Sequence, residues 1–237
     1  MDTVAVAMVC KTPIAGQSKT RLSPPLGAED CARLSACFIR DVASTIDSLC
    51  DDGDVTGYAV YTPEGSETLL QPLLPPRFRL LLQCDGDLGN RLIRAADRLL
   101  AAGHAGFVLV NADGPTLPRA ILRAAAHAVR CTNRLVIGPA LDGGYTLIGC
   151  SKLHAEVFTG IPWSTAEVYR ATIERARAIA LPVVNVPPWY DVDDLASLHI
   201  LQAELRGEPP SCAASGITGG EAPATRRFLA ALADVAP

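Results

Sequence analysis

A group of positive side chains follows the first apolar run of the chain, in the loop formed by residues 11–21. The chain has only three lysines, and two of them, Lys11 and Lys19, lie in this loop together with Arg21. An ammonium is a compact charge that suits a phosphate oxygen, and a guanidinium can grip a second oxygen with its planar fork. Gly16 lets backbone N–H groups approach an anion closely. The loop therefore predicts a phosphate-binding site, although a solvated basic loop would have the same composition.

Aspartates stand at two further places where a strand is predicted to end. Asp113 comes directly after an apolar run at 106–110, and Asp191, Asp193 and Asp194 follow a run at 182–186. Ligands of an open α/β sheet bind beyond the carboxyl ends of its strands, and carboxylates are the ligands that Mg²⁺ prefers. Asp194 is explained as the N-cap of the next helix, and a lone Asp113 would be a turn residue more often than a ligand. Together the acids predict a magnesium site.

Two more polar loops have the same placement after a predicted strand. They are residues 85–91, and residues 138–145, which contain Asp142 followed by Gly143 and Gly144. A double glycine permits a close approach of the backbone to a ligand, and it is equally a simple way to turn a chain. Four polar loops at the carboxyl edge of one sheet would form a single crevice.

The elements that must position these loops alternate along the chain. Apolar runs predict strands at 3–9, 55–61, 78–83, 106–110, 134–138, 145–149 and 182–186. Helical spacing predicts helices around 31–46 and at 88–102, 118–129, 164–178 and 194–205, with a capping residue, Ser164, opening the fourth. This alternation predicts an α/β fold, a mostly parallel sheet with helices on both faces.

The composition changes after Arg206. Gly, Pro, Ser and Thr dominate as far as Pro223, and a short amphipathic helix is predicted at 224–233. We therefore expect one domain at 1–206, followed at 207–237 by a linker and a short C-terminal helix.

Charge and composition exclude several classes of protein. The formal net charge of −4 argues against a general nucleic-acid or membrane-surface binder, because both need a dense positive face. No apolar run approaches the roughly 18 residues of a membrane span, and the acidic start does not match a signal peptide, so we expect a cytoplasmic protein. The eight cysteines and four histidines lack the spacing of a zinc site, and the cysteines are expected to be reduced, buried side chains.

The ordered motifs of residues 3–205 resemble the bacterial family of radical-SAM/selenodomain-associated transferases, whose fold is that of the glycosyltransferase A and nucleotidyltransferase superfamily. The basic loop and the Asp-Val-Asp element are also similar to those of 2-phospholactate and molybdenum-cofactor guanylyltransferases. The motifs that carry the resemblance are Lys11-Thr12-Pro13 with Gly16 and Lys19-Thr20-Arg21-Leu22, Gly86-Asp87-Leu88-Gly89-Asn90-Arg91, Asp113-Gly114-Pro115, Pro139-Ala140 with Asp142-Gly143-Gly144-Tyr145, Ile161-Pro162-Trp163-Ser164-Thr165, and Asp191-Val192-Asp193.

The resemblance implies a nucleotide-diphospho-sugar transferase-like site with a role for each motif. Its nucleotide-binding residues would be Lys11, Thr12, Gly16, Lys19, Arg21, Gly89 and Asn90, with Lys19 and Arg21 on the phosphates. Asp113 with Asp193, or Asp191, would hold Mg²⁺ or Mn²⁺. The acceptor would meet Gly143, Gly144, Tyr145, Trp163, Ser164 and Thr165, and Asp142 would be the base on an acceptor hydroxyl if the reaction is glycosyl transfer. Asn111-Ala112, where Gly-Ser is usual, and Asp194, where the family has Thr, depart from its pattern.

Three functions are compatible with these residues. The first is Mg²⁺-assisted nucleotidyl transfer from a nucleoside triphosphate to a small phosphorylated or hydroxylic acceptor, for which a cationic loop after the first strand is well suited. The second is glycosyl transfer from a nucleotide-sugar, for which the protein has to bind only the diphosphate of the donor. The third is a catalytically silent nucleotide-binding protein, which would not need paired carboxylates.

Overall fold

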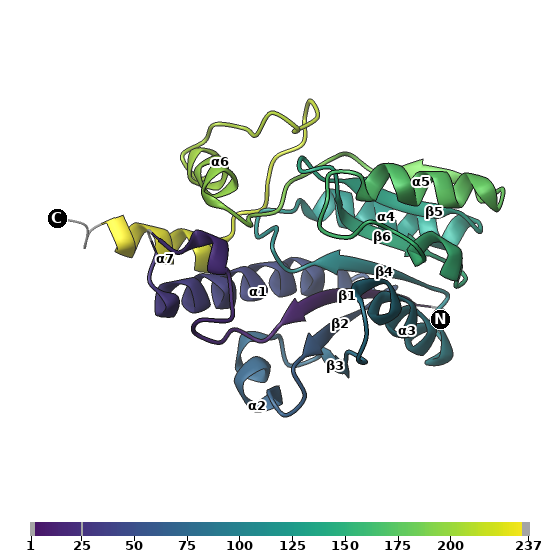
Figure 1. Cartoon of the computed structure of the whole chain (residues 1–237), viewed down its shortest axis with the longest axis horizontal. Coiled ribbons are helices and arrows are strands. Elements are labelled where there is room, and N and C mark those ends of the chain that lie inside the picture. Colours follow the sequence, from purple (N-terminus) through teal and green to yellow (C-terminus); the bar gives the residue numbers. More distant parts are fainter. Residues whose placement is uncertain (1–2, 25, 234–237) are drawn as a thin grey trace.

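The protein forms a seven-stranded sheet covered by helices on both faces, as the computed structural model in Figure 1 shows. The structure describes residues 3–24 and 26–233, so the ends of the two predicted units, at 1–2 and 234–237, lie outside the described residues. The strand order is β3-β2-β1-β4-β6-β5-β7. The predicted α/β class with a mostly parallel sheet is confirmed.

Every predicted strand is present. The bounds are β1 Val4–Lys11, β2 Val55–Thr62, β3 Arg79–Leu82, β4 Gly106–Asn111, β5 Leu135–Pro139, β6 Tyr145–Cys150 and β7 Val183–Asn185. β6 is antiparallel to both of its neighbours, β4 and β5. The connection from β5 to β6 spans only residues 140–144, which is long enough for a hairpin but too short for the crossover that a parallel pair needs.

The two faces of the sheet are separated by the alternation of side chains along β1. Val4, Val6 and Met8 point into one core, together with α1 (Ala28–Cys50), α4 (Arg119–Cys131) and α6 (Leu195–Leu205). Ala5 and Ala7 point into the other core, with α3 (Leu88–Ala101) and α5 (Val168–Ala178). The apolar character of successive β1 residues is therefore explained by burial on both faces.

The prediction of a helix at 164–178 opened by Ser164 is wrong in its first turn. α5 begins at Val168, its N-cap is Glu167 without a side-chain hydrogen bond, and Ser164 has a left-handed backbone with φ 63°. Residues 161–167 instead form a loop beside the sheet edge. The structure also adds a short helix, α2 (Glu67–Leu70), and three 3₁₀ turns at Thr20–Leu22, Gln71–Leu73 and Ala155–Phe158.

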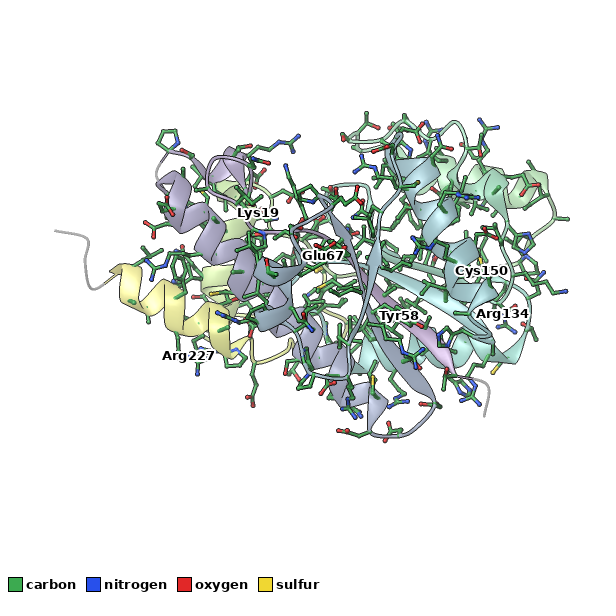
Figure 2. All side chains as sticks on the ribbon, turned by 90° about the horizontal axis from the view of Figure 1, so that it is seen from below. Lys19, Tyr58, Glu67, Arg134, Cys150 and Arg227 are labelled. Carbon is green, nitrogen blue, oxygen red and sulfur yellow. The ribbon has the colours of Figure 1, made fainter. Side chains whose placement is uncertain are left out.

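The C-terminal segment is anchored to α1. Helix α7 (Pro223–Ala233) lies against α1, as Figure 2 shows near Arg227, and its Phe228 joins the α1 core. The buried carboxylate of Asp41, in the middle of α1, accepts hydrogen bonds from the N–H groups of Ala224 (2.9 Å) and Thr225 (2.8 Å). These are first-turn donors that lack intrahelical partners, so Asp41 stabilises the start of α7. The division into 1–206 and 207–237 stays a prediction.

The chain order of the strands defines where a ligand can bind. From β1 the chain runs outward to β2 and β3, and it then returns to place β4 on the other side of β1. Such a switch point leaves a crevice beyond the carboxyl ends of β1 and β4. Among the residues that the structure describes, none of the helices combines the length and apolar character that a bilayer crossing requires.

Candidate functional site

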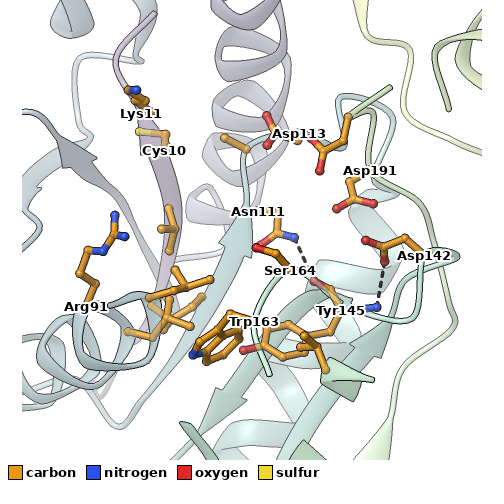
Figure 3. Close-up of a pocket in the computed structure, with 18 of the residues that line it drawn as sticks. Cys10, Lys11, Arg91, Asn111, Asp113, Asp142, Tyr145, Trp163, Ser164 and Asp191 are labelled. Carbon is orange, nitrogen blue, oxygen red and sulfur yellow. Dashed lines mark hydrogen bonds between the residues drawn. The ribbon is translucent and has the colours of Figure 1, made fainter. Parts of the chain in front are cut away.

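A cavity of about 720 Å³ opens at this switch point, a size typical of small-molecule sites. Cys10 and Lys11 reach it from the end of β1, and Asn111 and Asp113 reach it from the end of β4. Figure 3 shows Cys10, Lys11 and Arg91 on one side and Asp113, Asp142 and Asp191 on the other. Lys11 and Arg91 thus lie across the pocket from three of its aspartates.

The segment 189–193 brings the acids together because its aromatic residues are anchored. Trp189 and Tyr190 are fully buried, and the Trp189 indole donates a hydrogen bond to Thr116 Oγ1 (3.2 Å). The Tyr190 hydroxyl donates to the carboxylate of Glu204. The Val192 N–H then donates to the Asp113 main-chain oxygen (2.9 Å). The acids of this segment are therefore held beside the end of β4.

Gly114 allows this close contact. A Cβ atom at Gly114 would lie 3.1 Å from the main-chain oxygen of Tyr190, tighter than ordinary packing. Asp194, in contrast, is the N-cap of α6. Its side chain accepts a hydrogen bond from Ser197 N–H, and the Ser197 side chain accepts one from Asp194 N–H, which together form a capping box. The prediction of Asp194 as a cap is confirmed.

Asp191 is a half-buried carboxyl of the pocket that lies near three other acids. Burial, followed by the charges of Asp142, Asp193 and Asp113, raises its pKa to about 7. Figure 3 shows the carboxylates of Asp191 and Asp142 facing each other, and Asp142 Oδ1 accepts a hydrogen bond from Gly144 N–H (2.8 Å). A buried carboxylate surrounded by like charges is a feature of functional sites rather than of stable cores.

Lys19 lies among these acids rather than at the open end of the pocket. Its ammonium is 2.8 Å from Asp113 Oδ1 and 2.8 Å from Asp193 Oδ1, and it donates to the Val192 carbonyl at 2.7 Å. Burial alone would lower the pKa of Lys19, but the two carboxylates outweigh it and raise the pKa. The structure thus brings together Asp113 and Asp193, the predicted pair of metal ligands, and places the predicted phosphate ligand Lys19 between them.

Lys11 and Arg91 form the positive side of the pocket, whereas Arg21, which also lines it, lies near Asp194. Lys11 is exposed and contacts only the Gln17 carbonyl (3.2 Å), and Arg91 makes two long contacts, to Asp87 O (3.4 Å) and Gln83 Oε1 (3.5 Å). Cys10 lies next to Lys11 on this side of the pocket, and burial and then Asp113 raise the pKa of its thiol to about 12, so it is neutral. Sequence reasoning missed Arg91 and Gln83 as pocket residues, although Arg91 ends one of the ordered motifs.

Four residues expected at the nucleotide do not line the pocket. Thr12 is fully buried, and its hydroxyl is hydrogen bonded to Ser66 Oγ (2.7 Å). Gly16 has φ 74° with open space around it, so it serves the turn of the basic loop. Gly89 packs under Phe158, and Asn90 is exposed beside the Asp87 cap of α3. These positions shape the loops, and Leu88, Arg91 and Leu92 of α3 face the pocket instead.

Gly89 is required by packing, which a substitution can test. A Cβ atom there would meet the Phe158 carbonyl oxygen at 2.5 Å and Trp163 Nε1 at 3.2 Å. We expect Gly89→Ala to lower the free energy of unfolding by roughly 1–3 kcal/mol through overpacking, measured by urea denaturation. Gly220→Ala is the control, since a Cβ there makes only ordinary contacts at 3.6 Å or more, and its effect should stay within about 0.5 kcal/mol. Equal effects of the two substitutions would contradict the packing role.

The third side of the pocket is aromatic and matches the predicted acceptor residues. Tyr145 and Trp163 meet edge to face with ring centroids 6.3 Å apart, and Gly144, Ser164 and Thr165 lie beside them.

Gly143 is not part of the pocket wall. Its φ is 89°, and a Cβ atom would lie 2.2 Å from the Ala166 main-chain oxygen. Gly143 therefore lets the loop 140–144 pack against the loop 161–167, which carries Trp163 and Ser164. Sequence reasoning identified the correct loop but assigned this glycine to the ligand rather than to the neighbouring loop.

Comparisons with known proteins agree with this architecture. A crystal structure from Desulfovibrio desulfuricans G20, provisionally described as a nucleotide-diphospho-sugar transferase, has 28% sequence identity and a TM-score of 0.81 over 99% of this chain and 98% of that chain. The 4-diphosphocytidyl-2C-methyl-D-erythritol synthase of Anaerococcus prevotii DSM 20548 has 9% identity and a TM-score of 0.54 over 86% of this chain and 96% of that chain.

A third similar structure is a CMP:2-keto-3-deoxy-manno-octonic acid synthetase complexed with CTP, with 10% identity and a TM-score of 0.54 over 87% of this chain and 99% of that chain. At such low identity the two synthases show the fold alone. No curated protein sequence matches significantly. The structural neighbours are transferases, and this chain is a transferase of the same fold. The family DUF2064, described as uncharacterized proteins conserved in bacteria, matches residues 45–165, just over half of the chain, and the protein therefore belongs to DUF2064.

Proposed function

We propose that this protein transfers a nucleotidyl group from a nucleoside triphosphate to a small acceptor with the help of a divalent cation. The observation that carries the proposal is one pocket at the switch point in which Lys11 and Arg91 face a cluster of aspartates, with Arg21 as a further lining cation. Cationic side chains suit the phosphates, and carboxylates suit the metal that bridges them. The closer resemblance to radical-SAM/selenodomain-associated transferases also remains a proposal.

The donor chemistry of the acidic side fits a divalent cation. Asp113, Asp142, Asp191 and Asp193 share the pocket, and Lys19 supplies the one ammonium that contacts two of them. Burial first, and then the charges of Asp142, Asp193 and Asp113, raise the pKa of Asp191, and a bound cation would offset both effects. In the described part of the chain no three His, Cys, Asp or Glu side chains converge on one point as preformed metal ligands, so side chains must adjust on binding. We assign Asp113, Asp193 and Asp191 to the metal, which would neutralise charge on the phosphates when bound.

The remaining residues orient the reactants. Lys11, Arg21 and Arg91 hold the phosphates, and the Tyr145–Trp163 side receives the acceptor. An acceptor oxygen attacks the α-phosphorus, the bond from that phosphorus to the bridging oxygen of the β-phosphate breaks, and pyrophosphate leaves. Asp142, held by the Gly144 N–H, accepts the proton of the attacking hydroxyl. Alignment and charge stabilisation thus account for the catalysis we propose.

Glycosyl transfer is the second candidate, favoured by the aromatic side of the pocket. A ring such as that of Trp163 can stack on the apolar face of a sugar. The 28% identical neighbour is also provisionally described as a nucleotide-diphospho-sugar transferase. In this reaction a nucleoside diphosphate would leave instead of pyrophosphate.

The leaving group separates the two candidates. The protein is incubated with Mg²⁺, an acceptor mixture and either nucleoside triphosphates or nucleotide-sugars, and released pyrophosphate and nucleoside diphosphate are measured by mass spectrometry. Nucleotidyl transfer predicts pyrophosphate together with a nucleotidylated acceptor. Release of nucleoside diphosphate with a glycosylated acceptor would replace the proposal with the second candidate.

Arg91→Gln is expected to weaken binding of the productive triphosphate about tenfold, or about 1.4 kcal/mol. The long contacts of Arg91 leave its guanidinium available to a phosphate. Arg94→Gln is the matched control on the same helix, because Arg94 is exposed and lies near Asp97 (3.7 Å) outside the pocket. Affinities are compared by calorimetric titration. Equal losses of affinity in the two variants would show that Arg91 acts only through the net charge of the protein.

A further inference from the structure

Lys19 is positioned as an internal cation, with all three ammonium protons matched to protein acceptors. The acceptors are Asp113 Oδ1, Asp193 Oδ1 and the Val192 carbonyl, at 2.7–2.8 Å. Only 6% of the side chain is exposed, and the Phe38 ring lies below the ammonium at 5.5 Å. An ammonium has three donors and no more, so none is left for a phosphate in this arrangement.

The backbone also fixes Lys19 in this place. Lys19 has a left-handed conformation, φ 50° and ψ 39°, which residues other than glycine adopt rarely. The preceding residue, Ser18, is buried, and its hydroxyl accepts a hydrogen bond from Ile14 N–H (3.0 Å). Leu22 N–H donates to the Lys19 carbonyl (2.9 Å) and opens the turn Thr20–Leu22. Figure 2 shows Lys19 beside α1, within the body of the molecule.

The two carboxylates that hold the ammonium are the two that the proposed function assigns first to the metal. A divalent cation bound to Asp113 and Asp193 would occupy the space of the ammonium and repel it at short range. The two cations therefore exclude each other. In the described part of the chain, the ion pairs of Lys19 are with Asp113 and Asp193, so Asp142 and Asp191 supply the negative charge that would draw a second cation into the pocket.

We infer that Asp113, Asp193 and the Val192 carbonyl form a cation site that Lys19 fills in the free protein and from which a divalent cation displaces it. This inference rests on the proposed function for the identity of that cation. Once displaced, the Lys19 ammonium turns into the pocket, which Lys11, Arg21 and Arg91 also line. Metal binding thereby converts an internal ion pair into a phosphate ligand, and it orders the two events: metal first, full phosphate contact second.

Lysine labelling of the wild-type protein tests the exchange without any substitution. The chain has three lysines, and Lys152 lies on the surface outside the pocket. With an acylating reagent and peptide mass spectrometry, Lys11 and Lys152 should react quickly and Lys19 slowly in the absence of metal. Saturating Mn²⁺ should accelerate the reaction of Lys19 at least fivefold and leave Lys152 unchanged. If Mn²⁺ binds and Lys19 stays protected, the ion occupies other ligands and the inference is wrong.

Metal affinity of a variant gives the second test. Lys19→Gln removes the competing charge, so its dissociation constant for Mn²⁺, measured by electron paramagnetic resonance, should fall at least tenfold. Lys152→Gln is the control and should leave the constant within twofold. An unchanged or weaker affinity in folded Lys19→Gln would overturn the exchange. Absence of Mn²⁺ binding to the wild type would instead remove the divalent cation from the proposed function, and the inference with it. Exchange without any transfer activity would leave the inference intact and count against the proposed function alone.

Discussion

Asp113→Asn is expected to slow metal-dependent transfer by roughly a hundredfold while the protein stays folded. Asparagine keeps the size and the turn-forming ability of the residue, and the bond from Val192 N–H to the main-chain oxygen of residue 113 does not depend on the side chain. A loss of about 3 kcal/mol of transition-state stabilisation corresponds to this factor, at about 1.4 kcal/mol for each tenfold change. The rate is measured by pyrophosphate release across a Mg²⁺ titration.

Asp194→Asn is the matched control for this prediction. It removes the same charge from a nearby residue, and asparagine caps helices as well as aspartate does, so α6 should be retained. Its transfer rate should stay within a few fold of the wild type. Higher Mg²⁺ should recover part of the rate of Asp113→Asn, because a weakened site still fills by mass action. A folded Asp113→Asn protein that transfers at the wild-type rate in low Mg²⁺ would reduce Asp113 to a turn residue.

Asp191→Asn should make the metal-free protein more stable at pH 8. The pKa of this carboxyl is raised from 3.8 to about 7, so the folded state binds its proton more tightly than the unfolded state does. Stability from this group is therefore present below pH 4, is lost as the pH rises to about 7, and stays lost above it. At 1.36 kcal/mol per unit, the cost at pH 8 has an upper bound of about 4 kcal/mol. The variant should melt on the order of 5 °C higher than the wild type.

The pH dependence and the metal dependence of this gain are both diagnostic. The difference in melting temperature should shrink as the pH falls toward 4, where Asp191 is protonated in the wild type. Added Mg²⁺ should also narrow this difference in melting temperature at pH 8, because the ion stabilises the wild type, which retains the Asp191 carboxylate, and not the variant. Differential scanning calorimetry at pH 5 and pH 8, with and without Mg²⁺, measures all four cases. A variant less stable than the wild type at pH 8 would mean that Asp191 has a compensating partner.

The strands could be predicted from the sequence because burial on both faces of a sheet leaves long apolar runs. β1, β4 and β6 start and end within two residues of the predicted ranges. The first turn of α5 could not be predicted, since the loop 161–167 contains residues that helices also use. Its course depends on contact with Gly143, which is distant in the sequence.

The acids of the site could be predicted from their places at strand ends. Asp113, Asp142, Asp191 and Asp193 all line one pocket, because carboxyl ends of neighbouring strands meet at one edge. The ion pairs of Lys19 with Asp113 and Asp193 could not be predicted, because these residues are far apart in the sequence and only tertiary packing brings them together.

Two other features have long-range causes that no local pattern reports. The anchoring of α7 depends on Asp41. The local sequence predicts that an aspartate within a helix is exposed to solvent, but this one is buried and binds the first turn of α7. The burial of Thr12 depends on Ser66, in another loop. In both cases the polar partner is supplied by packing between elements, so composition and spacing give no signal for it.

The central claim is that a nucleotide and a divalent cation bind this pocket together. It is tested most directly by the melting temperature of the wild-type protein with each nucleoside triphosphate and nucleotide-sugar, in the presence and absence of Mg²⁺. A ligand at a hundred times its dissociation constant stabilises the folded state by about 2.7 kcal/mol, which should raise the melting temperature by roughly 5–10 °C. We predict such a rise for at least one triphosphate, only when Mg²⁺ is present, and its loss in Asp113→Asn. A melting temperature that no nucleotide changes, with or without Mg²⁺, would contradict the claim.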